Sequence, residues 1–287
     1  MPTITLNGRD LTPEAVVQVA RHGAPVELAP EALAAIRASR ATIDSLVARG
    51  EAVYGVTTGF GDLATVRIEP ADVRRLQENL VISHAVGVGP LLARDAVRAM
   101  LVLRANTLAR GQSGVRPEVV ERLLAFLRLG LHPCVPEQGS VGASGDLAPL
   151  AHLASPLLGR GRAELDGEIL DGASALARVG LAPLRLEAKE GLALLNGTQL
   201  MTGIGALLVH DADRLARTAS IIAAMSVEAL QGTDVAFSAA YQAARPHAGQ
   251  SQVAAELRAL LADSELPDRQ PRTRHRCPGA PPRTSLR

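Results

Sequence analysis

The sequence predicts an all-α fold, a bundle of long helices with small irregular or β elements near the N-terminus. The 287 residues are 47% hydrophobic and 21% charged, which is typical of a globular protein with a large core. Aromatic residues make up 2% of the chain and tryptophan is absent, so alanine and leucine must fill that core. Such small and aliphatic side chains favour close helix–helix contacts, and several long segments have helical periodicity.

The N-terminal segments carry clear start and stop signals. Residues 3–6 are expected to form a short strand that ends at Asn7-Gly8. Thr12 followed by Pro13 predicts a helix start, because the hydroxyl can cap and proline suits the first helical position. A second helix is expected over 30–48, ending at Gly50, and a glycine-rich loop follows over 51–62.

The remaining elements follow from the same patterns. Residues 130–145 are rich in glycine and proline and should be irregular, and Asp166-Gly167 indicates a small hairpin. Helices are expected over 70–85, 92–109, 117–129, 188–230 and 250–261.

The chain divides by composition into a partial domain over 1–262 and an aberrant tail over 263–287. The tail is rich in proline and arginine and has no acidic residue after Asp268. We expect it to be disordered, or to result from a shifted reading frame. A nucleic-acid-binding role would depend on this tail alone, since the net charge is only +1.

Other features favour a cytoplasmic protein without a membrane span. The N-terminus has no signal peptide pattern, and the two cysteines, Cys134 and Cys277, do not suggest a disulfide framework. The apolar segment 192–230 contains charged residues between 211 and 217, which favours a bundle helix over a membrane span.

The segment Ala143-Ser144-Gly145 can carry unusual chemistry. The Gly145 amide nitrogen is unhindered and can attack the Ala143 carbonyl to close a five-membered ring. Loss of one water from the ring and one from the Ser144 side chain leaves a methylidene-imidazolone, an electrophile that needs no external cofactor. The alternative is an ordinary turn in which Ser144 caps the helix that begins near Asp146.

Four segments together resemble the aromatic amino acid ammonia-lyases, over roughly residues 1–262. The run 139–152, GSVGASGDLAPLAH, is similar to the family's electrophile motif. Residues 54–61 (YGVTTGFG) resemble its tyrosine loop, 77–84 (QENLVISH) its selectivity helix, and 194–199 (LLNGTQ) its carboxylate-binding segment. The resemblance implies a fold of the fumarase/aspartase-like type, with the electrophile loop at the N-terminal end of a helix.

The resemblance also implies roles for single residues. Tyr54 would be the base that removes the β-hydrogen of the substrate, with a loop anchor as the alternative. Asn196 and Gln199, three apart at a helix start, would hold the substrate carboxylate or the ring oxygen. Asn196 could also cap that helix. His84 lies seven residues after Gln77 on one helix face and would help to place the substrate.

Substrate and partners are implied in the same way. The pair Ser83-His84 is similar to the histidine-specific members, which implies conversion of L-histidine to trans-urocanate and ammonia. The other histidines should be structural, and their spacing predicts no metal site. Family members form homotetramers and are considerably longer, with a Tyr-Ser-x-Arg motif in the second half that Thr284-Ser285-Leu286-Arg287 echoes only faintly.

Three readings therefore stay open at this point. The chain is an active ammonia-lyase, alone or complemented by a second polypeptide. Alternatively, it is a catalytically inactive truncated fragment of such an enzyme. A third reading is a lyase or aminomutase of the same family that acts on another aromatic amino acid.

Overall fold

The computed structural model describes residues 1–59, 61, 66, 68–69 and 72–264. The tail predicted over 263–287 lies outside these residues from position 265 onward, and so do Phe60 of the tyrosine loop and Cys277. The chain divides into a first unit, Met1–His210, and a second unit that begins at Asp211.

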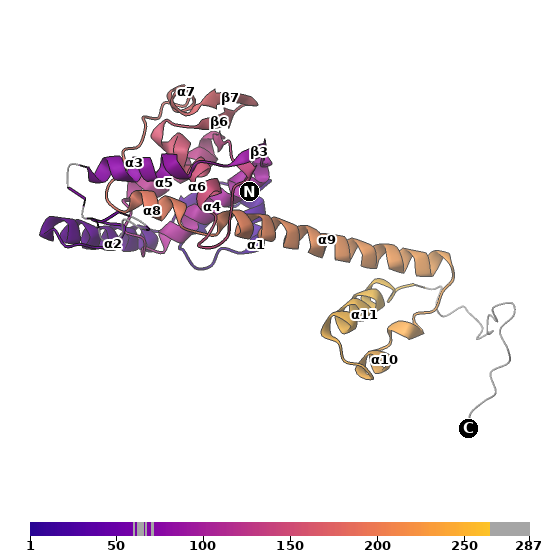
Figure 1. Cartoon of the computed structure of the whole chain (residues 1–287). Helices are drawn as coiled ribbons and strands as arrows, with labels where there is room; N and C mark the ends of the chain where they lie inside the picture. The colour runs from indigo at the N-terminus through magenta and orange to yellow at the C-terminus, as the bar shows by residue number, and fades with distance from the viewer. Residues whose placement is uncertain (60, 62–65, 67, 70–71, 265–287) are drawn as a thin grey trace. The chain divides into compact units, whose positions relative to one another are not determined.

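The first unit is built mainly of helices, which confirms the predicted fold class (Figure 1). Its helices are α1 (Pro13–Ala20), α2 (Pro30–Arg49), α3 (Val73–His84), α4 (Arg94–Ala109), α5 (Pro117–Leu129), α6 (Leu147–Ala154), the 3-10 helix η2 (Ser155–Leu158), α7 (Gly172–Arg178), α8 (Glu190–Leu195) and the first part of α9 (Gln199–Ala229). Its strands are β1 (Ile4–Leu6), β2 (Val26–Leu28), β3 (Val88–Leu91), β4 (His132–Pro133), β5 (Pro136–Gln138), β6 (Arg162–Leu165) and β7 (Glu168–Asp171).

The predicted helix ends are confirmed by their local geometry. The Thr12 hydroxyl accepts a hydrogen bond from the Ala15 amide at 3.2 Å, and Pro13 is the first residue of α1. Gly50 ends α2 with a φ of 63°, the left-handed conformation that favours glycine. These caps explain why the boundaries of α1 and α2 are readable from the sequence.

Small sheets accompany the helices. β1 and β2 pair in parallel, β3 pairs with β5, and β4, β6 and β7 form a three-stranded sheet. The hairpin predicted at Asp166-Gly167 joins β6 to β7, and both turn residues have positive φ, 52° and 86°. The strands on both sides of this turn are thus confirmed, whereas β2, β3, β4 and β5 were not predicted.

The core of the first unit is aliphatic, as the composition predicts. Helix α4 lies within it and contacts α1, α2, α5 and α6. Its buried apolar side chains are those of Ala96, Val97, Ala99, Met100, Leu101, Val102, Ala105, Leu108 and Ala109. Two arginines, Arg98 and Arg104, are buried on the same helix. The core therefore contains two cations whose partners must be found nearby.

The single helix predicted over 188–230 is wrong in one respect. Helix α8 ends at Leu195, and α9 begins at Gln199. By length and composition, the segment Glu190–Ala229 is also apolar enough to cross a membrane. The break between the two helices, and the charged side chains between 211 and 217, instead suit a helix of a protein bundle.

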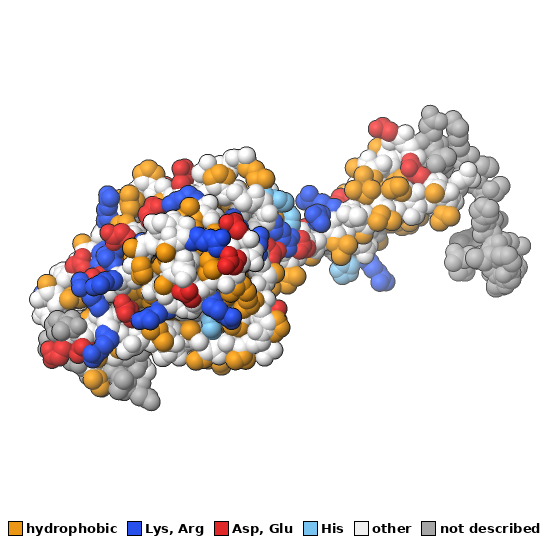
Figure 2. Space-filling view, turned by 90° about the horizontal axis from the view of Figure 1, so that it is seen from above, with side chains coloured by type: hydrophobic (Ala, Val, Ile, Leu, Met, Phe, Trp, Pro, Cys, Tyr) orange, Lys and Arg blue, Asp and Glu red, His pale blue; other side chains and the backbone are white. Residues whose placement is uncertain are grey.

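The second unit contains the rest of α9, the 3-10 helix η3 (Val235–Phe237), α10 (Ala239–Ala243) and α11 (Ala248–Leu260). The helix predicted over 250–261 is thus confirmed. Its small core consists of Ala224, Leu257 and Leu261. Many hydrophobic side chains of this unit are exposed (Figure 2), among them Leu215, Ile221, Ile222, Met225 and Leu230. So much exposed apolar surface is unusual for a protein that functions as a monomer.

Candidate active site

The tripeptide Ala143-Ser144-Gly145 lies in the turn that leads directly into α6, as predicted. Ala143 and Ser144 are exposed, and α6 begins two residues after Gly145. The N-cap residue of α6 is Asp146, so the alternative in which Ser144 caps this helix is wrong. Backbone N–H groups at a helix start favour negative charge nearby, which suits an electrophile that must accept electrons.

Gly145 occupies a position that only glycine fits. Its φ is +113°, a region that residues with a side chain rarely adopt. A Cβ atom at this position would lie well under 3.0 Å from the carbonyl oxygen of Gly197. The missing side chain, on which the proposed ring closure depends, is therefore also required by the packing of the loop.

Asp146 joins the tripeptide to the start of α9, a role that the sequence analysis missed. Its side chain is buried; one carboxylate oxygen accepts from the Ser140 hydroxyl at 2.7 Å. The other accepts from the amides of Leu200 and Met201 at 3.0 and 3.1 Å. Asp146 thus caps α9, a task that the sequence offered to Asn196 only as an alternative to substrate binding. An acidic residue directly after Gly145 was the available signal.

The segment between α8 and α9 packs against the tripeptide from the other side. The Gly197 carbonyl accepts a hydrogen bond from the Asp146 amide at 2.7 Å. Asn196 is the extended C-cap residue directly after α8, and its backbone carbonyl accepts from Arg104 at 3.1 Å. The backbone of this segment is therefore fixed by contacts on both sides.

Asn196 and Gln199 do not share a helix face, contrary to the sequence prediction. Asn196 is the C-cap residue that follows α8, whereas Gln199 is the first residue of α9. The Gln199 side chain is buried, where its oxygen accepts from Arg104 at 2.8 Å and its nitrogen donates to the Thr107 hydroxyl at 3.2 Å. The structure places Gln199 behind the Asn196 backbone and not in the cavity described below.

His84 lies at the last position of α3. Its Nδ1 is 2.8 Å from the carbonyl oxygen of Leu80, which can only accept, so Nδ1 carries the proton. In the neutral ring, Nε2 is then a hydrogen-bond acceptor. The arrangement fixes both the orientation and the tautomer of this imidazole.

One cavity of about 230 Å³ brings four of the predicted site residues together. Tyr54, His84, Ser144 and Asn196 all line it, and these come from four segments that are far apart in the sequence. Apolar side chains complete the wall: Leu80, Leu147, Leu192 and Leu195. A second cavity of about 210 Å³ is lined by Ser83, His84 and all three residues of the tripeptide. Ser144 therefore faces space that a small molecule could enter.

The described walls of both cavities are uncharged. The polar residues that line the first cavity are Tyr54, His84, Ser144 and Asn196. Neutral donors and acceptors of this kind can orient a polar ligand without neutralising an electrophile. Among the residues that the structure describes, no cluster of His, Cys, Asp or Glu side chains suits a metal ion.

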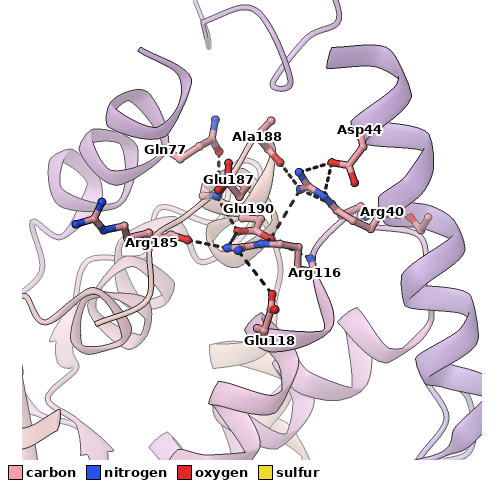
Figure 3. A network of polar contacts seen from close by, with 12 residues as sticks. Arg40, Asp44, Gln77, Arg116, Glu118, Arg185, Glu187, Ala188 and Glu190 are labelled. Carbon is pink, nitrogen blue, oxygen red and sulfur yellow. Dashed lines mark hydrogen bonds and ion pairs between the residues drawn. The ribbon is translucent and has the colours of Figure 1, made fainter. Parts of the chain in front are cut away.

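A buried ionic network holds α8 in place (Figure 3). The Glu190 side chain is fully buried, and it accepts from the Arg116 guanidinium at 2.9 Å through both oxygens. Arg40 lies 3.8 Å from the same carboxylate. The pair with Glu190 raises the pKa of Arg116. Because Leu192 and Leu195 of α8 and the following residue Asn196 line the cavity, this network at the first turn of α8 also supports the cavity wall.

Helices α3 and α8 are joined directly as well. The Gln77 side-chain oxygen accepts from the Gly191 amide at 2.9 Å, and a Cβ at Gly191 would lie well under 3.0 Å from the Gln77 carbonyl (Figure 3). This contact sets the distance between α3, which carries His84, and α8, which leads into Asn196. Gln77 therefore supports the site instead of lining it.

Comparison with known proteins agrees with this geometry. Residues 11–286 match the aromatic amino acid lyase family. The histidine ammonia-lyase of Gloeobacter violaceus is 54% identical over 263 residues, which cover 92% of this chain and 51% of the relative. This chain therefore spans about half the length of the curated relatives that it matches.

Solved structures give the same result. A tyrosine aminomutase from Streptomyces globisporus superposes with a TM-score of 0.85 at 43% identity, covering 91% of this chain and 49% of the aminomutase. A histidine ammonia-lyase from Trypanosoma cruzi superposes with a TM-score of 0.83 at 41% identity, covering 90% of this chain and 50% of the lyase. Because the family match covers residues 11–286, nearly the whole sequence, the chain belongs to the aromatic amino acid lyase family.

Proposed function

We propose that this polypeptide functions as a cytoplasmic histidine ammonia-lyase, alone or together with a second polypeptide. The enzyme converts L-histidine to trans-urocanate and ammonia. The observation that carries the proposal is the cavity shared by Ser144, Tyr54, His84 and Asn196. Three relatives named histidine ammonia-lyase, which are 53% or 54% identical in sequence to this chain, support the choice of substrate.

The residues of the tripeptide fit a methylidene-imidazolone. Gly145 has no side chain, a positive φ and a close neighbour in the Gly197 carbonyl, while Ser144 faces the cavity. Once formed from Ala143, Ser144 and Gly145, this group would supply an electrophilic carbon for the substrate amine, which makes the amine a better leaving group.

The other side chains would bind and orient the substrate. With Nδ1 committed to Leu80, the Nε2 of His84 can accept the N–H of a substrate imidazole. The Asn196 amide can donate to the substrate carboxylate. Tyr54, whose side chain is 54% exposed on its loop, would take the proton from the β-carbon of the substrate.

Partner subunits are part of the proposal. Members of this family form homotetramers, and the exposed apolar side chains of α9 support association of this chain too. A second polypeptide that carries the remaining half of the relatives' length would be a further partner.

Two measurements on the purified chain test the function. If the ring forms, the intact mass will be two water molecules below the encoded mass. Ser144→Ala removes the leaving hydroxyl, so this variant can lose at most the one water of ring closure and cannot reach the doubly dehydrated mass. An encoded mass in the unsubstituted chain would refute the electrophile. Urocanate absorbs in the near ultraviolet, so incubation with L-histidine measures turnover directly. A dehydrated chain that produces no urocanate would support the inactive-fragment alternative.

An aminomutase is the second candidate function. The 43% identity to a tyrosine aminomutase of solved structure favours it. Both reactions begin with removal of ammonia, but an aminomutase adds it back to the β-carbon. Incubation with L-tyrosine and L-histidine, followed by chromatography of the amino acids, separates the two. A β-amino acid product would indicate the mutase, and urocanate with free ammonia the lyase.

A further inference from the structure

Arg104 is a buried cation at the back of the candidate site. It lies on α4 with 2% of its surface exposed, the largest of the fully buried side chains. Across the described residues no carboxylate lies within ion-pairing distance of it, and its Nε has no hydrogen-bond acceptor. Burial lowers the pKa of Arg104 to about 10, so the guanidinium still carries its charge at neutral pH. Such a group is costly to bury, and its contacts must compensate.

The compensating contacts come from the start of the α8–α9 connection and from the first residue of α9. The Arg104 Nη1 donates to the Asn196 carbonyl at 3.1 Å and to the Gln199 side-chain oxygen at 2.8 Å. The Asn196 carbonyl belongs to the C-terminus of α8, where a positive charge is favourable. A Cβ atom at Gly197 would lie well under 3.0 Å from the same Nη1. The guanidinium therefore determines where the backbone of Asn196 and Gly197 can lie.

The same backbone contacts the tripeptide on its other side. The Gly197 carbonyl accepts from the Asp146 amide at 2.7 Å, and Gly145 packs against it too closely for any side chain. The Asn196 side chain lines the cavity together with Ser144. Arg104 therefore contacts the backbone segment Asn196–Gly197, and this segment in turn contacts the ring-forming tripeptide and carries the amide proposed to bind substrate.

We propose that Arg104 is a positioning residue for the electrophile. It holds the Asn196–Gly197 backbone so that Gly197 fixes the Gly145–Asp146 peptide for ring closure and Asn196 faces the cavity. The part of this inference that concerns the ring rests on the proposed function, whereas the part that concerns the backbone does not.

Arg98 offers a matched control on the same helix. It too is buried, and within the described residues it has no carboxylate partner. Its guanidinium donates to the carbonyls of Val19 and Ala20 at the end of α1, between 2.8 and 3.1 Å. Arg98→Met and Arg104→Met therefore remove the same kind of group from the same core, but only Arg104 contacts the candidate site.

The test compares the unsubstituted chain with Arg104→Met, Arg104→Lys and Arg98→Met. Amide hydrogen exchange is followed at Asp146, Leu200 and Met201, whose amides donate to Gly197 or to Asp146. We expect exchange at these amides to rise roughly tenfold or more in Arg104→Met and to stay unchanged in Arg98→Met. Intact mass gives the dehydrated fraction, which should fall only in the Arg104 variants.

Arg104→Lys keeps the charge but loses the planar fork, so it should restore part of the protection and part of the dehydration. If Arg104→Met does not fold, Arg104→Lys takes its place in the comparison with Arg98→Met. Equal exchange and equal dehydration in the Arg104 and Arg98 variants would overturn the inference. If the unsubstituted chain shows no dehydration while Arg104→Met still loses protection, the positioning of Asn196–Gly197 is supported and the proposed electrophile fails.

Discussion

At the scale of single residues, Gly145 combines a backbone requirement with a chemical one. We predict that Gly145→Ala destabilises the fold by about 2 kcal/mol or more, because a Cβ would collide with the Gly197 carbonyl at a positive φ. Ring formation should be lost at the same time, since the added methyl group hinders the attacking nitrogen. Urea unfolding and intact mass measure the two effects.

Gly142 is the control for this prediction. It also has a positive φ, +75°, but nothing lies within 4 Å of a Cβ at that position. Gly142→Ala should therefore show only backbone strain, about 1 kcal/mol, and retain dehydration. If both substitutions lower the free energy of unfolding by the same amount, the contact of residue 145 with Gly197 does not contribute to the effect.

His132 gives a residue-scale prediction that concerns pH. Burial, and then the nearby charge of Arg98, lower the pKa of His132 to about 4. The side chain also faces Arg94 and Glu164, whose carboxylate lies 3.8 Å from Nδ1. Because the unfolded state binds the proton first, stability contributed by neutral His132 is present above about pH 6.5 and is lost as the pH falls toward 4.

The free energy of unfolding should fall by roughly 3 kcal/mol at most, which corresponds to the difference between the pKa of 6.5 in the unfolded chain and about 4 in the folded one. His132→Gln keeps a hydrogen-bond acceptor for Arg98 and removes the titration. Free energies of unfolding measured from pH 7 to pH 4 should therefore decline less steeply in the variant. Parallel curves for the two proteins would show that His132 is not buried as a neutral group.

At the scale of elements, the position of α8 depends on Glu190. We predict that Glu190→Gln lowers the free energy of unfolding by about 3 kcal/mol, because it leaves Arg116 and Arg40 without their buried carboxylate. Since α8 leads to Asn196, hydrogen exchange in residues 190–197 should rise as well. Thermal unfolding and exchange measure these effects.

Glu118 provides the matched control, since its carboxylate lies 3.6 Å from Arg116 but is largely exposed. Glu118→Gln should change stability by about 0.5 kcal/mol or less. A similar loss in both variants would mean that the burial of Glu190 does not matter.

The elements also show what a sequence can and cannot predict. Helix ends marked by proline, a capping hydroxyl or glycine, as in α1 and α2, were correctly predicted because these signals are local. The break at 196–198 was predicted only in part: Asn196 was expected at a helix start, but no helix was expected to end just before it, because apolar periodicity continues on both sides. What ends α8 there is a set of long-range contacts from Arg104 and Asp146, and no local pattern contains them.

The same division holds for the site. Tyr54, His84, Ser144 and Asn196 were found through motifs, and one cavity joins them. Gln199 was assigned to substrate through its motif as well, but the structure pairs it with Arg104. Arg104 itself lies in an apolar stretch of α4 without any motif, so only three-dimensional contacts identify it.

At the scale of the whole molecule, the exposed apolar side chains call for a partner surface. In the second unit, Leu215 and Ile222 are seven residues apart on α9, and Met225 follows Ile222 by three, so all three share one face of the helix. Leu215 is 71% exposed. A stripe of this kind is stable in water only when another apolar surface covers it.

We therefore predict that the chain associates through this stripe and that Leu215→Glu weakens the association. A charge buried at such a contact would cost several kcal/mol unless it is paired, so the dissociation constant should rise by roughly 100-fold or more. Arg217→Glu introduces the same side chain on the opposite face of α9, and it should leave association unchanged. Sedimentation velocity over a range of concentrations measures both. A monomer at all concentrations in the unsubstituted chain, or equal weakening by both variants, would show that the Leu215 face is not a subunit contact.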